Sequence, residues 1–183
     1  DIHDMGNQPG KKTAKWAVIG AGPAGIAAVG KLLDHGILPE HILWIDPYFK
    51  VGDLGKYWSN VSSNTKVKYF TAFLQAVSSF AYEYQATHFF LDNLDAEETC
   101  SLGYVVAPLQ WITEQLAKKV VAVRTSIHSM SLSERIWSLN DGTTTYKSHN
   151  VILATGSVPS NLNYPGVDVI PFESAIDKDK FYS

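Results

Sequence analysis

The chain has 183 residues, of which 45% are hydrophobic and 18% are charged, and its formal net charge is −3. This composition is typical of a globular chain with a sizeable core, and the slight excess of acid argues against nucleic acid as a partner, because phosphate binding needs surplus Lys and Arg. The single cysteine, Cys100, excludes an internal disulfide and a cysteine-rich metal site. No stretch reaches the roughly 20 apolar residues of a membrane span. We therefore expect a cytoplasmic protein.

The first part of the chain predicts a strand, a glycine turn, a helix and a second strand. Residues 1–15 are polar and are expected to form a flexible lead-in. The apolar run Trp16–Gly20 predicts a buried parallel strand, Pro23–His35 a helix that stops at Gly36, and Ile42–Ile45 a second buried strand. A unit of this kind, about 30 residues long, is a βαβ unit with a right-handed crossover.

The middle of the chain is less regular. Val51–Lys68 is rich in Gly, Ser and Asn and predicts a loop, and the aromatic-dense stretch Phe70–Leu102 predicts short helices. Pro108–Val120 has helical spacing of apolar residues, and Val120–Val123 predicts a strand.

The last part of the chain predicts more strands. Ile127–Leu132 and Arg135–Leu139 alternate enough for a β-meander, with Asn140–Gly142 as a turn, and Val151–Ala154 reads as another buried strand. The fold class is therefore α/β: a Rossmann-like domain with a central parallel sheet and a small β-meander.

The loop Gly20-Ala-Gly22-Pro23-Ala24-Gly25 is a complete Gly-x-Gly-x-x-Gly motif between the predicted strand and helix. In such a loop the first glycine permits the tight turn, the second lets the backbone approach a pyrophosphate, and the third lets the helix pack close to the strand. The free N–H groups of the helix N-terminus then face the phosphates. The loop therefore predicts a dinucleotide site that includes Pro23 and Ala24.

An acid follows the second strand. Asp46 lies about 20 residues after Gly25, where a carboxylate accepts hydrogen bonds from the adenosine ribose and repels a 2′-phosphate. The acid therefore favours FAD or NAD over NADP in this site, and Pro47 beside it joins the candidate cofactor-binding residues.

Two further segments carry a family resemblance. Gly52-Asp-Leu-Gly55-Lys-Tyr-Trp58 and Ser62-Ser-Asn64-Thr65-Lys66 follow Asp46. With them the chain resembles the two-dinucleotide-binding flavoproteins, and within these the flavin-containing monooxygenases. The resemblance implies that both segments lie along FAD, near its ribityl chain and flavin ring. It adds five candidate cofactor-binding residues: Gly55, Lys56, Trp58, Asn64 and Thr65.

The resemblance continues toward the end of the chain. Thr125–Met130 looks like the family's strand segment whose backbone meets the adenine, which would place Ile127 there. Val151–Ala154, followed by Thr155 and Gly156, looks like its apolar strand ending in Ala-Thr-Gly, so Ala154, Thr155 and Gly156 are also candidate FAD contacts. The resemblance implies an FAD-binding domain over residues 16–174, with residues 175–183 as the start of a linker or a truncated tail.

The chain departs from the family pattern in several places. It has Asp46 where the family usually has Glu, and Gly52-Asp53 where the family has Gly-Gly. It has no second Gly-x-Gly-x-x-Gly after Gly25, which the family uses for NAD(P)H, and it lacks the late aspartate segment that helps to hold FAD. We therefore expect a domain that is incomplete relative to the family, as a fragment missing a C-terminal domain or a natural short form. The NAD(P)H site of the full-length family member would be absent here.

Three functions remain open at this point. The first is the FAD-binding portion of a flavin-dependent NAD(P)H oxidoreductase, most like a flavin monooxygenase. The second is a non-catalytic dinucleotide-binding remnant that acts through partners, and the third is a single-domain NAD-dependent dehydrogenase. The sequence assigns no catalytic residue and no metal ligand, and it leaves the small-molecule substrate and a homo-oligomeric state undetermined. It lacks the cysteine pair that glutathione-reductase-type relatives carry, because Gly52–Asn64 contains no cysteine.

Overall fold

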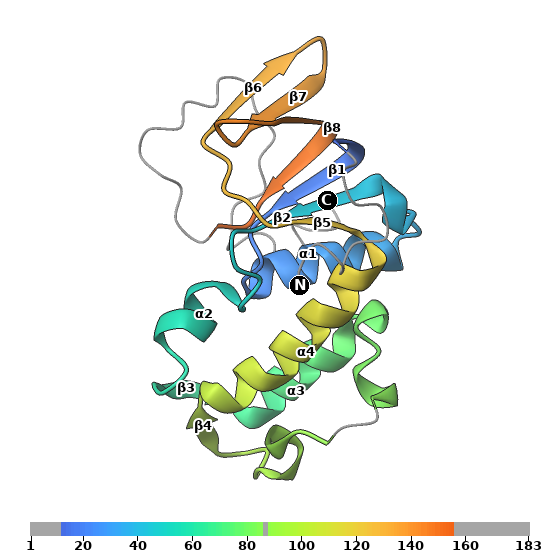
Figure 1. Ribbon diagram of the computed structural model, residues 1–183. Helices are drawn as coiled ribbons and strands as arrows, with labels where there is room; N and C mark the ends of the chain where they lie inside the picture. The colour runs from blue at the N-terminus through green and yellow to red at the C-terminus, as the bar shows by residue number, and fades with distance from the viewer. Residues whose placement is uncertain (1–11, 86–87, 156–183) are drawn as a thin grey trace.

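The computed structural model describes residues 12–85 and 88–155, and its centre is a six-stranded sheet in the order β5–β2–β1–β8–β7–β6 (Figure 1). The strands β5, β2, β1 and β8 pair in parallel, whereas β8, β7 and β6 pair antiparallel. The expected α/β fold, with a central parallel sheet and a β-meander, is confirmed. The strands of this sheet are β1 (Thr13–Ile19), β2 (Ile42–Ile45), β5 (Val121–Val123), β6 (Ser129–Ser133), β7 (Ile136–Asn140) and β8 (Thr145–Leu153).

The βαβ unit predicted from the sequence is present. Helix α1 (Pro23–Asp34) connects β1 to β2, and the two strands pair in parallel with Trp16 opposite Ile42. The short 3-10 helix η2 (Pro39–His41) leads into β2. β1 begins at Thr13, earlier than the expected Trp16, because Thr13 already pairs with Lys147 of β8.

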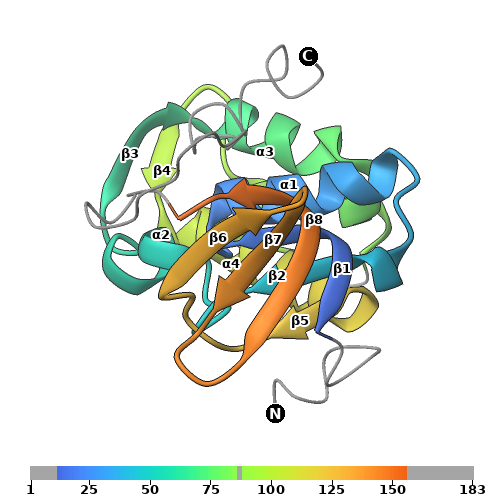
Figure 2. The same ribbon diagram turned by 90° about the horizontal axis from the view of Figure 1, so that it is seen from above.

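Strand β8 joins the two halves of the sheet. Its first part pairs antiparallel with β7 and its later part pairs parallel with β1, so one nine-residue strand serves both (Figure 2). The predicted strand Val151–Ala154 is the buried end of this longer strand. The predicted Asn140–Gly142 turn is confirmed: the Asp141 carboxylate accepts hydrogen bonds from the backbone N–H groups of Thr143 (2.9 Å) and Thr144 (2.7 Å).

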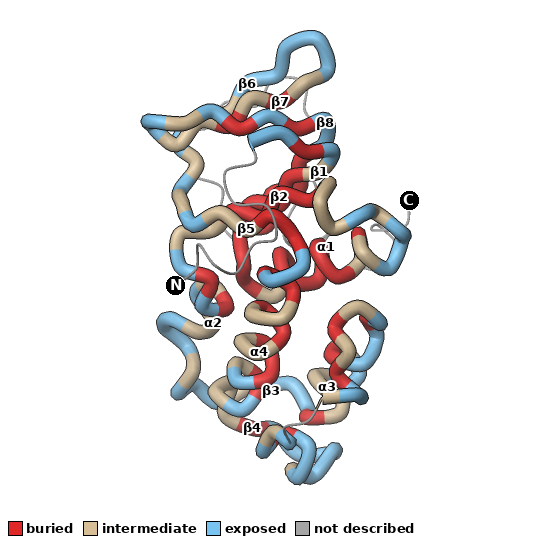
Figure 3. Tube along the Cα trace, turned by 45° about the vertical axis from the view of Figure 1, so that its right-hand side comes forward, coloured by how far each residue is buried: buried red, intermediate tan, exposed pale blue. Residues whose placement is uncertain are grey.

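The sheet is covered on both faces, which explains why its parallel strands read as continuous apolar runs. Figure 3 shows the buried segments concentrated in the sheet and in the helices beside it. Val18, Trp44 and Ile152 face the helical core that includes α1 and α4 (Gly103–Lys119). The intervening residues face a second core with the meander, and its fully or nearly fully buried members include Ala17, Leu43, Ile45, Trp137 and Leu139.

A second, two-stranded antiparallel sheet lies among the helices. It pairs β3 (Ser62–Lys66) with β4 (Thr99–Ser101). The prediction of a loop over Val51–Lys68 is therefore wrong in part, because α2 (Gly52–Tyr57) and β3 form within it. The polar run of β3 carries no strand signal of its own, and its pairing with β4, some distance along the chain, makes it a strand.

The aromatic middle of the chain forms short helices, as predicted. They are α3 (Val67–Ala76) and the 3-10 helices η3 (Ser78–Phe80), η4 (Tyr82–Tyr84) and η5 (Phe90–Asn93). Helix α4 begins at Gly103, five residues before the Pro108 at which the sequence predicts its start. Pro108 lies inside the helix and is buried. Proline is common in the first helical turn, so a helix start at Pro108 was the natural expectation, and this boundary is wrong.

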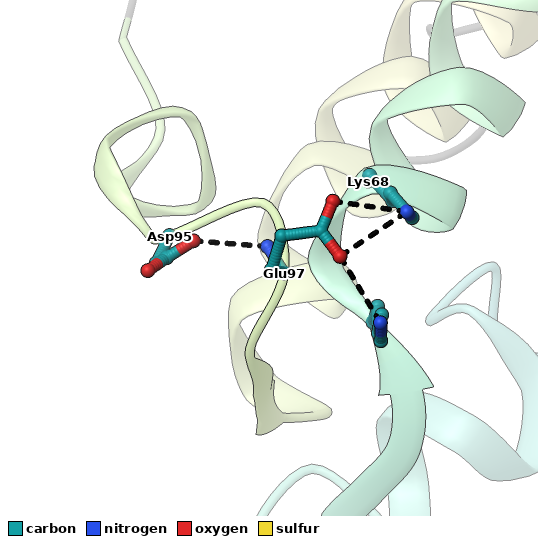
Figure 4. A network of polar contacts seen from close by, with 4 residues as sticks. Lys68, Asp95 and Glu97 are labelled. Carbon is teal, nitrogen blue, oxygen red and sulfur yellow. Dashed lines mark hydrogen bonds and ion pairs between the residues drawn. The ribbon is translucent and has the colours of Figure 1, made fainter.

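An exposed ion-pair network links β3 and α3 to the segment before β4 (Figure 4). The Glu97 carboxylate accepts from the Nζ atoms of Lys66 (3.0 Å) and Lys68 (2.9 Å), and its backbone N–H donates to Asp95. The hydrogen bonds from Lys68 and Lys66 hold the pKa of Glu97 below its ordinary value. Because all these groups are exposed, the network adds little stability.

Candidate functional site

A cavity of about 940 Å³ lies at the edge of the sheet where β1, β2, β5 and β8 end. Its wall combines the glycine loop, the start of the β2–α2 connection, α2, the β5–β6 connection and the end of β8. The strand ends are joined here: the backbone N–H of Gly20 donates to Ile45 (2.8 Å), and that of Ala154 donates to Ile19 (2.8 Å). Open parallel sheets bind ligands at this carboxyl edge, where the connections on either side of β1 diverge.

The first and third glycines of the loop are required by the protein's own backbone. Gly20 has φ +110°, and a Cβ built on it would lie 2.4 Å from the carbonyl oxygen of Ala154. A Cβ on Gly25 would lie 2.0 Å from the carbonyl oxygen of Gly20. These glycines therefore set the strand–loop–helix packing, as the motif predicts.

The second glycine is different, because the space beside it is open. A Cβ built on Gly22 would meet nothing closer than the Cα of Gly52, at 3.8 Å. Gly22 lines the cavity and is the N-cap of α1, with Pro23 in the first helical turn. No side chain caps this helix end and its first turn holds no acid, so no carboxylate on the helix offsets the partial positive charge of its N-terminus.

The carboxylate of Asp46 is bonded to three backbone N–H groups. Its Oδ1 accepts from Ala21 of the glycine loop (3.0 Å), and its Oδ2 accepts from Tyr48 (2.8 Å) and Phe49 (2.7 Å). An ionised carboxyl oxygen has about two lone-pair sites, so Oδ2 is saturated and Oδ1 keeps one site. Asp46, predicted from the sequence as a cofactor-binding residue, lines the cavity. Its hydrogen bond to the glycine loop was not predicted. A bond from this acid to a ribose stays a prediction.

Two glycines of α2, Gly52 and Gly55, also line the cavity. A Cβ on Gly52 would lie 2.9 Å from the Cα of Gly22, and a Cβ on Gly55 would lie 2.1 Å from the carbonyl oxygen of Lys50. Gly55 is thus required for the tight packing of α2 on the preceding turn. Asp53, between these two glycines, is exposed and lines the cavity.

Basic side chains surround the cavity. The Lys56 ammonium lies 4.8 Å from the ring centre of Tyr48 and 5.1 Å from that of Tyr57. A hydrogen bond with the Tyr57 hydroxyl, together with the nearby Tyr48 and Asp53, raises the pKa of Lys56 above its ordinary value. Arg124, directly after β5, donates from Nε to the carbonyl oxygen of Pro47 (2.8 Å). Arg124 is not among the residues predicted from the sequence, although its position at the end of a strand beside β2 could have identified it.

The structure brings most of the predicted site residues together. Those that line the cavity are Gly20, Gly22, Pro23, Asp46, Pro47, Gly55, Lys56, Trp58, Ile127, Ala154 and Thr155. Several other lining residues are not among those predicted from the sequence, including Ala21, Tyr48, Lys50, Leu54, Arg124 and Thr125.

The remaining predicted residues lie elsewhere. Ala24 and Gly25 are buried behind the loop, in the first turn of α1. Asn64 and Thr65 are exposed in β3 and are not part of the cavity wall; the Thr65 N–H donates to Ser63 Oγ (2.9 Å). Their proximity to a flavin stays a prediction. Gly156 lies outside the described residues.

Comparison with known proteins assigns the chain to a family. The pyridine nucleotide-disulphide oxidoreductase family matches residues 14–183. The chain belongs to this family. Its similarity to monooxygenase AgnR1 of Paecilomyces divaricatus is 33% identity over 167 residues, covering 81% of this chain and 41% of the relative. The chain thus spans about two fifths of the length of that curated relative. The expected resemblance to flavin-dependent oxidoreductases and monooxygenases is confirmed at the level of the family.

Solved structures share the fold. A crystal structure of OTEMO in complex with FAD and NADP superimposes with a TM-score of 0.57 at 17% identity, over 86% of this chain and 28% of that one. Bacillithiol disulfide reductase Bdr (YpdA) from Staphylococcus aureus superimposes with a TM-score of 0.57 at 14% identity, over 79% of this chain and 39% of that one. Both confirm the Rossmann-like architecture of this member of the family.

Two further observations concern the residues of this chain that the structure describes. Within residues 12–85 and 88–155, no helix has the length and apolar character needed to cross a bilayer. Over the same ranges, no group of three or more His, Cys, Asp or Glu side chains is placed to hold a metal ion. Cys100 is a free, buried thiol, and burial raises its pKa.

Proposed function

We propose that this chain holds FAD in the cavity at the carboxyl edge of the sheet, as the FAD-binding portion of a flavin-dependent NAD(P)H oxidoreductase most like a flavin monooxygenase. The observation that supports this most directly is the open space at Gly22. The space beside Gly20 and beside Gly25 is filled by the protein's own backbone. The space beside Gly22 instead faces the cavity and the N-terminus of α1. A pyrophosphate fits there, because a helix N-terminus supplies N–H donors and a partial positive charge.

The two ends of the cavity suit the two ends of the cofactor. Asp46 keeps one acceptor site on Oδ1 for a ribose hydroxyl, and the adenosine portion would extend toward Ile127 in the β5–β6 connection. The flavin portion would extend toward Trp58, at the end of α2. The residues of this chain would therefore bind and orient the cofactor at both ends, with Arg124 and Lys56 offsetting the charge of the phosphates.

Bound FAD would supply the redox chemistry, accepting electrons from a reduced nicotinamide cofactor and passing them to oxygen or another acceptor. The contribution of this chain is to hold the cofactor in one position and to shield part of it from water. A carboxylate at Asp46 disfavours the 2′-phosphate of NADPH in this cavity. In a catalytic cycle that uses NADPH, NADPH would accordingly bind at a different site. The relative named a monooxygenase and the OTEMO structure with FAD and NADP support a function that uses a flavin and a nicotinamide cofactor.

The proposal is tested by measuring which cofactor the purified protein binds. We expect a flavin absorption spectrum, either as purified or after addition of FAD, and a larger rise in unfolding temperature with FAD than with NAD⁺ or NADP⁺. ADP should bind more weakly than FAD, because it lacks the flavin portion that contacts the α2 side. Gly22→Val serves as the site-blocked variant in every titration.

Three results would argue for other functions. A folded protein that binds no FAD under any of these conditions would refute the proposal and favour the non-catalytic remnant. A thermal shift with NAD⁺ alone would favour a single-domain dehydrogenase. FAD binding that is unchanged in Gly22→Val would mean that the cofactor lies outside this cavity.

A further inference from the structure

The peptide group between Gly20 and Ala21 is held at both ends by side chains of one strand and its extension. The indole Nε1 of Trp44 donates to the carbonyl oxygen of Gly20 at 2.8 Å. The N–H of Ala21, at the other end of the same peptide, donates to Asp46 Oδ1 at 3.0 Å. Because a trans peptide points its C=O and N–H in opposite directions, the two contacts together set the rotation of this peptide plane.

The Gly20 carbonyl is buried against helix α1. It occupies the space in which a Cβ of Gly25 would lie, at 2.0 Å, so it is pressed against the first turn of α1. The contact with Trp44 is buried, and Trp44 itself is 0% exposed. A buried carbonyl without a donor is unfavourable, and indole N–H is the donor that a largely apolar side chain can bring into a core.

Trp44 and Asp46 also meet through a third residue. The Trp44 ring packs edge-on against the ring of Phe49, with ring centres 5.0 Å apart at 83°. The backbone N–H of Phe49 donates to Asp46 Oδ2 at 2.7 Å. The indole, the carboxylate and the turn after β2 therefore form one packed unit around the glycine loop.

We propose that Trp44 is a positioning residue for the dinucleotide site: its indole N–H fixes the Gly20–Ala21 peptide so that Gly22 and the start of α1 present their backbone to the pyrophosphate. Trp44 does not line the cavity and so acts only through the loop. This role rests on the proposed FAD site. Loss of the N–H frees the Gly20 carbonyl to rotate, which turns the Ala21 N–H away from Asp46 and alters the path of Gly22.

Two substitutions at position 44 separate the N–H from the bulk of the ring. Trp44→Phe removes the donor and part of the ring. Benzothienylalanine at this position, in which sulfur replaces the indole N–H, removes the donor and keeps the shape. Trp137→Phe is the matched control, because Trp137 is also buried but lies in β7, in the other core.

The first measurement is amide hydrogen exchange without any cofactor. We expect both position-44 variants to speed exchange of the Ala21 amide by about tenfold or more relative to the Val18 amide of β1, which reports opening of the core. Trp137→Phe should leave this ratio unchanged. If the exchange rate of the Ala21 amide relative to the Val18 amide is the same in the benzothienylalanine variant as in the parent, the proposal is overturned. The Gly20–Ala21 peptide would then be held without the indole N–H.

The second measurement is FAD affinity by titration. We expect about a tenfold loss in both position-44 variants, the loss expected when one well-placed contact is removed, and no loss in Trp137→Phe. Faster Ala21 exchange with unchanged affinity would also overturn the positioning role. If the parent binds no FAD, the proposed function fails and with it the positioning role, while the exchange ratio still reports whether Trp44 holds the peptide.

Discussion

Gly22 and Gly52 both line the cavity and lie close together, so that the glycine loop packs against the start of α2. The contact is asymmetric: a Cβ on Gly52 would lie 2.9 Å from Gly22, whereas a Cβ on Gly22 keeps 3.8 Å from Gly52. Gly52 also has φ +58°. Gly52 is therefore a requirement of the fold, and Gly22 is available to a ligand.

This asymmetry predicts the effect of Gly22→Val. We expect the variant to fold and to lose measurable FAD binding, because its side chain would enter the path of the pyrophosphate. Circular dichroism and FAD titration together check both parts. Gly36→Ala is the control glycine: its φ of +85° with open space around it predicts a destabilisation of about 1 kcal/mol and no change in FAD affinity. Full FAD affinity in Gly22→Val would place the phosphates elsewhere.

Asp46→Ala should lower stability as well as affinity. The carboxylate accepts three backbone N–H groups, so its removal leaves the N–H donors of Ala21, Tyr48 and Phe49 without this partner. We expect a loss of about 1–3 kcal/mol in the free energy of unfolding, measured in urea without cofactor. A variant as stable as the parent would show that water replaces these contacts at no cost.

Arg124→Gln tests the electrostatic part of the site. Arg124 lines the cavity, is exposed and bonds Pro47. We expect FAD affinity to fall about two- to fivefold at low salt, with little change in stability, because an exposed cation contributes modestly and is screened. The difference from the parent should shrink as salt is raised. A salt-independent loss would instead indicate a geometric role for the bond to Pro47.

Asp141 should make the meander sensitive to acid. Backbone hydrogen bonds from Thr144 and Thr143 lower the pKa of Asp141 from 3.8 to about 2 in the folded protein. A lowered folded-state pKa contributes stability that is fully present above pH about 4 and is lost as the pH falls toward 2. We expect Asp141→Asn to be less stable than the parent at neutral pH, and the difference to narrow below pH 4 in unfolding curves. A constant difference across this range would contradict the assignment.

Local patterns were enough for the βαβ unit and for the glycine loop. Trp16–Gly20 and Ile42–Ile45 read as buried strands because parallel strands covered on both faces are apolar throughout. Gly20 and Gly25 can be recognised in the sequence because contacts within one tight turn impose their spacing, with Gly25 against the carbonyl of Gly20. Asp46 followed from its place at the end of a strand.

Contacts between distant segments decided the rest. Ser62–Lys66 became a strand only by pairing with Thr99–Ser101, and no local propensity in its polar sequence announces that partner. Trp44 reads as one more apolar strand residue, and only the packed structure shows its N–H on the Gly20 carbonyl. The sequence by itself determined the fold class and the glycine loop that lines the cavity, because periodicity and glycine spacing are local. The tertiary structure decided which groups hold the loop, because a hydrogen bond across the core depends on where the whole sheet places its donor and its acceptor.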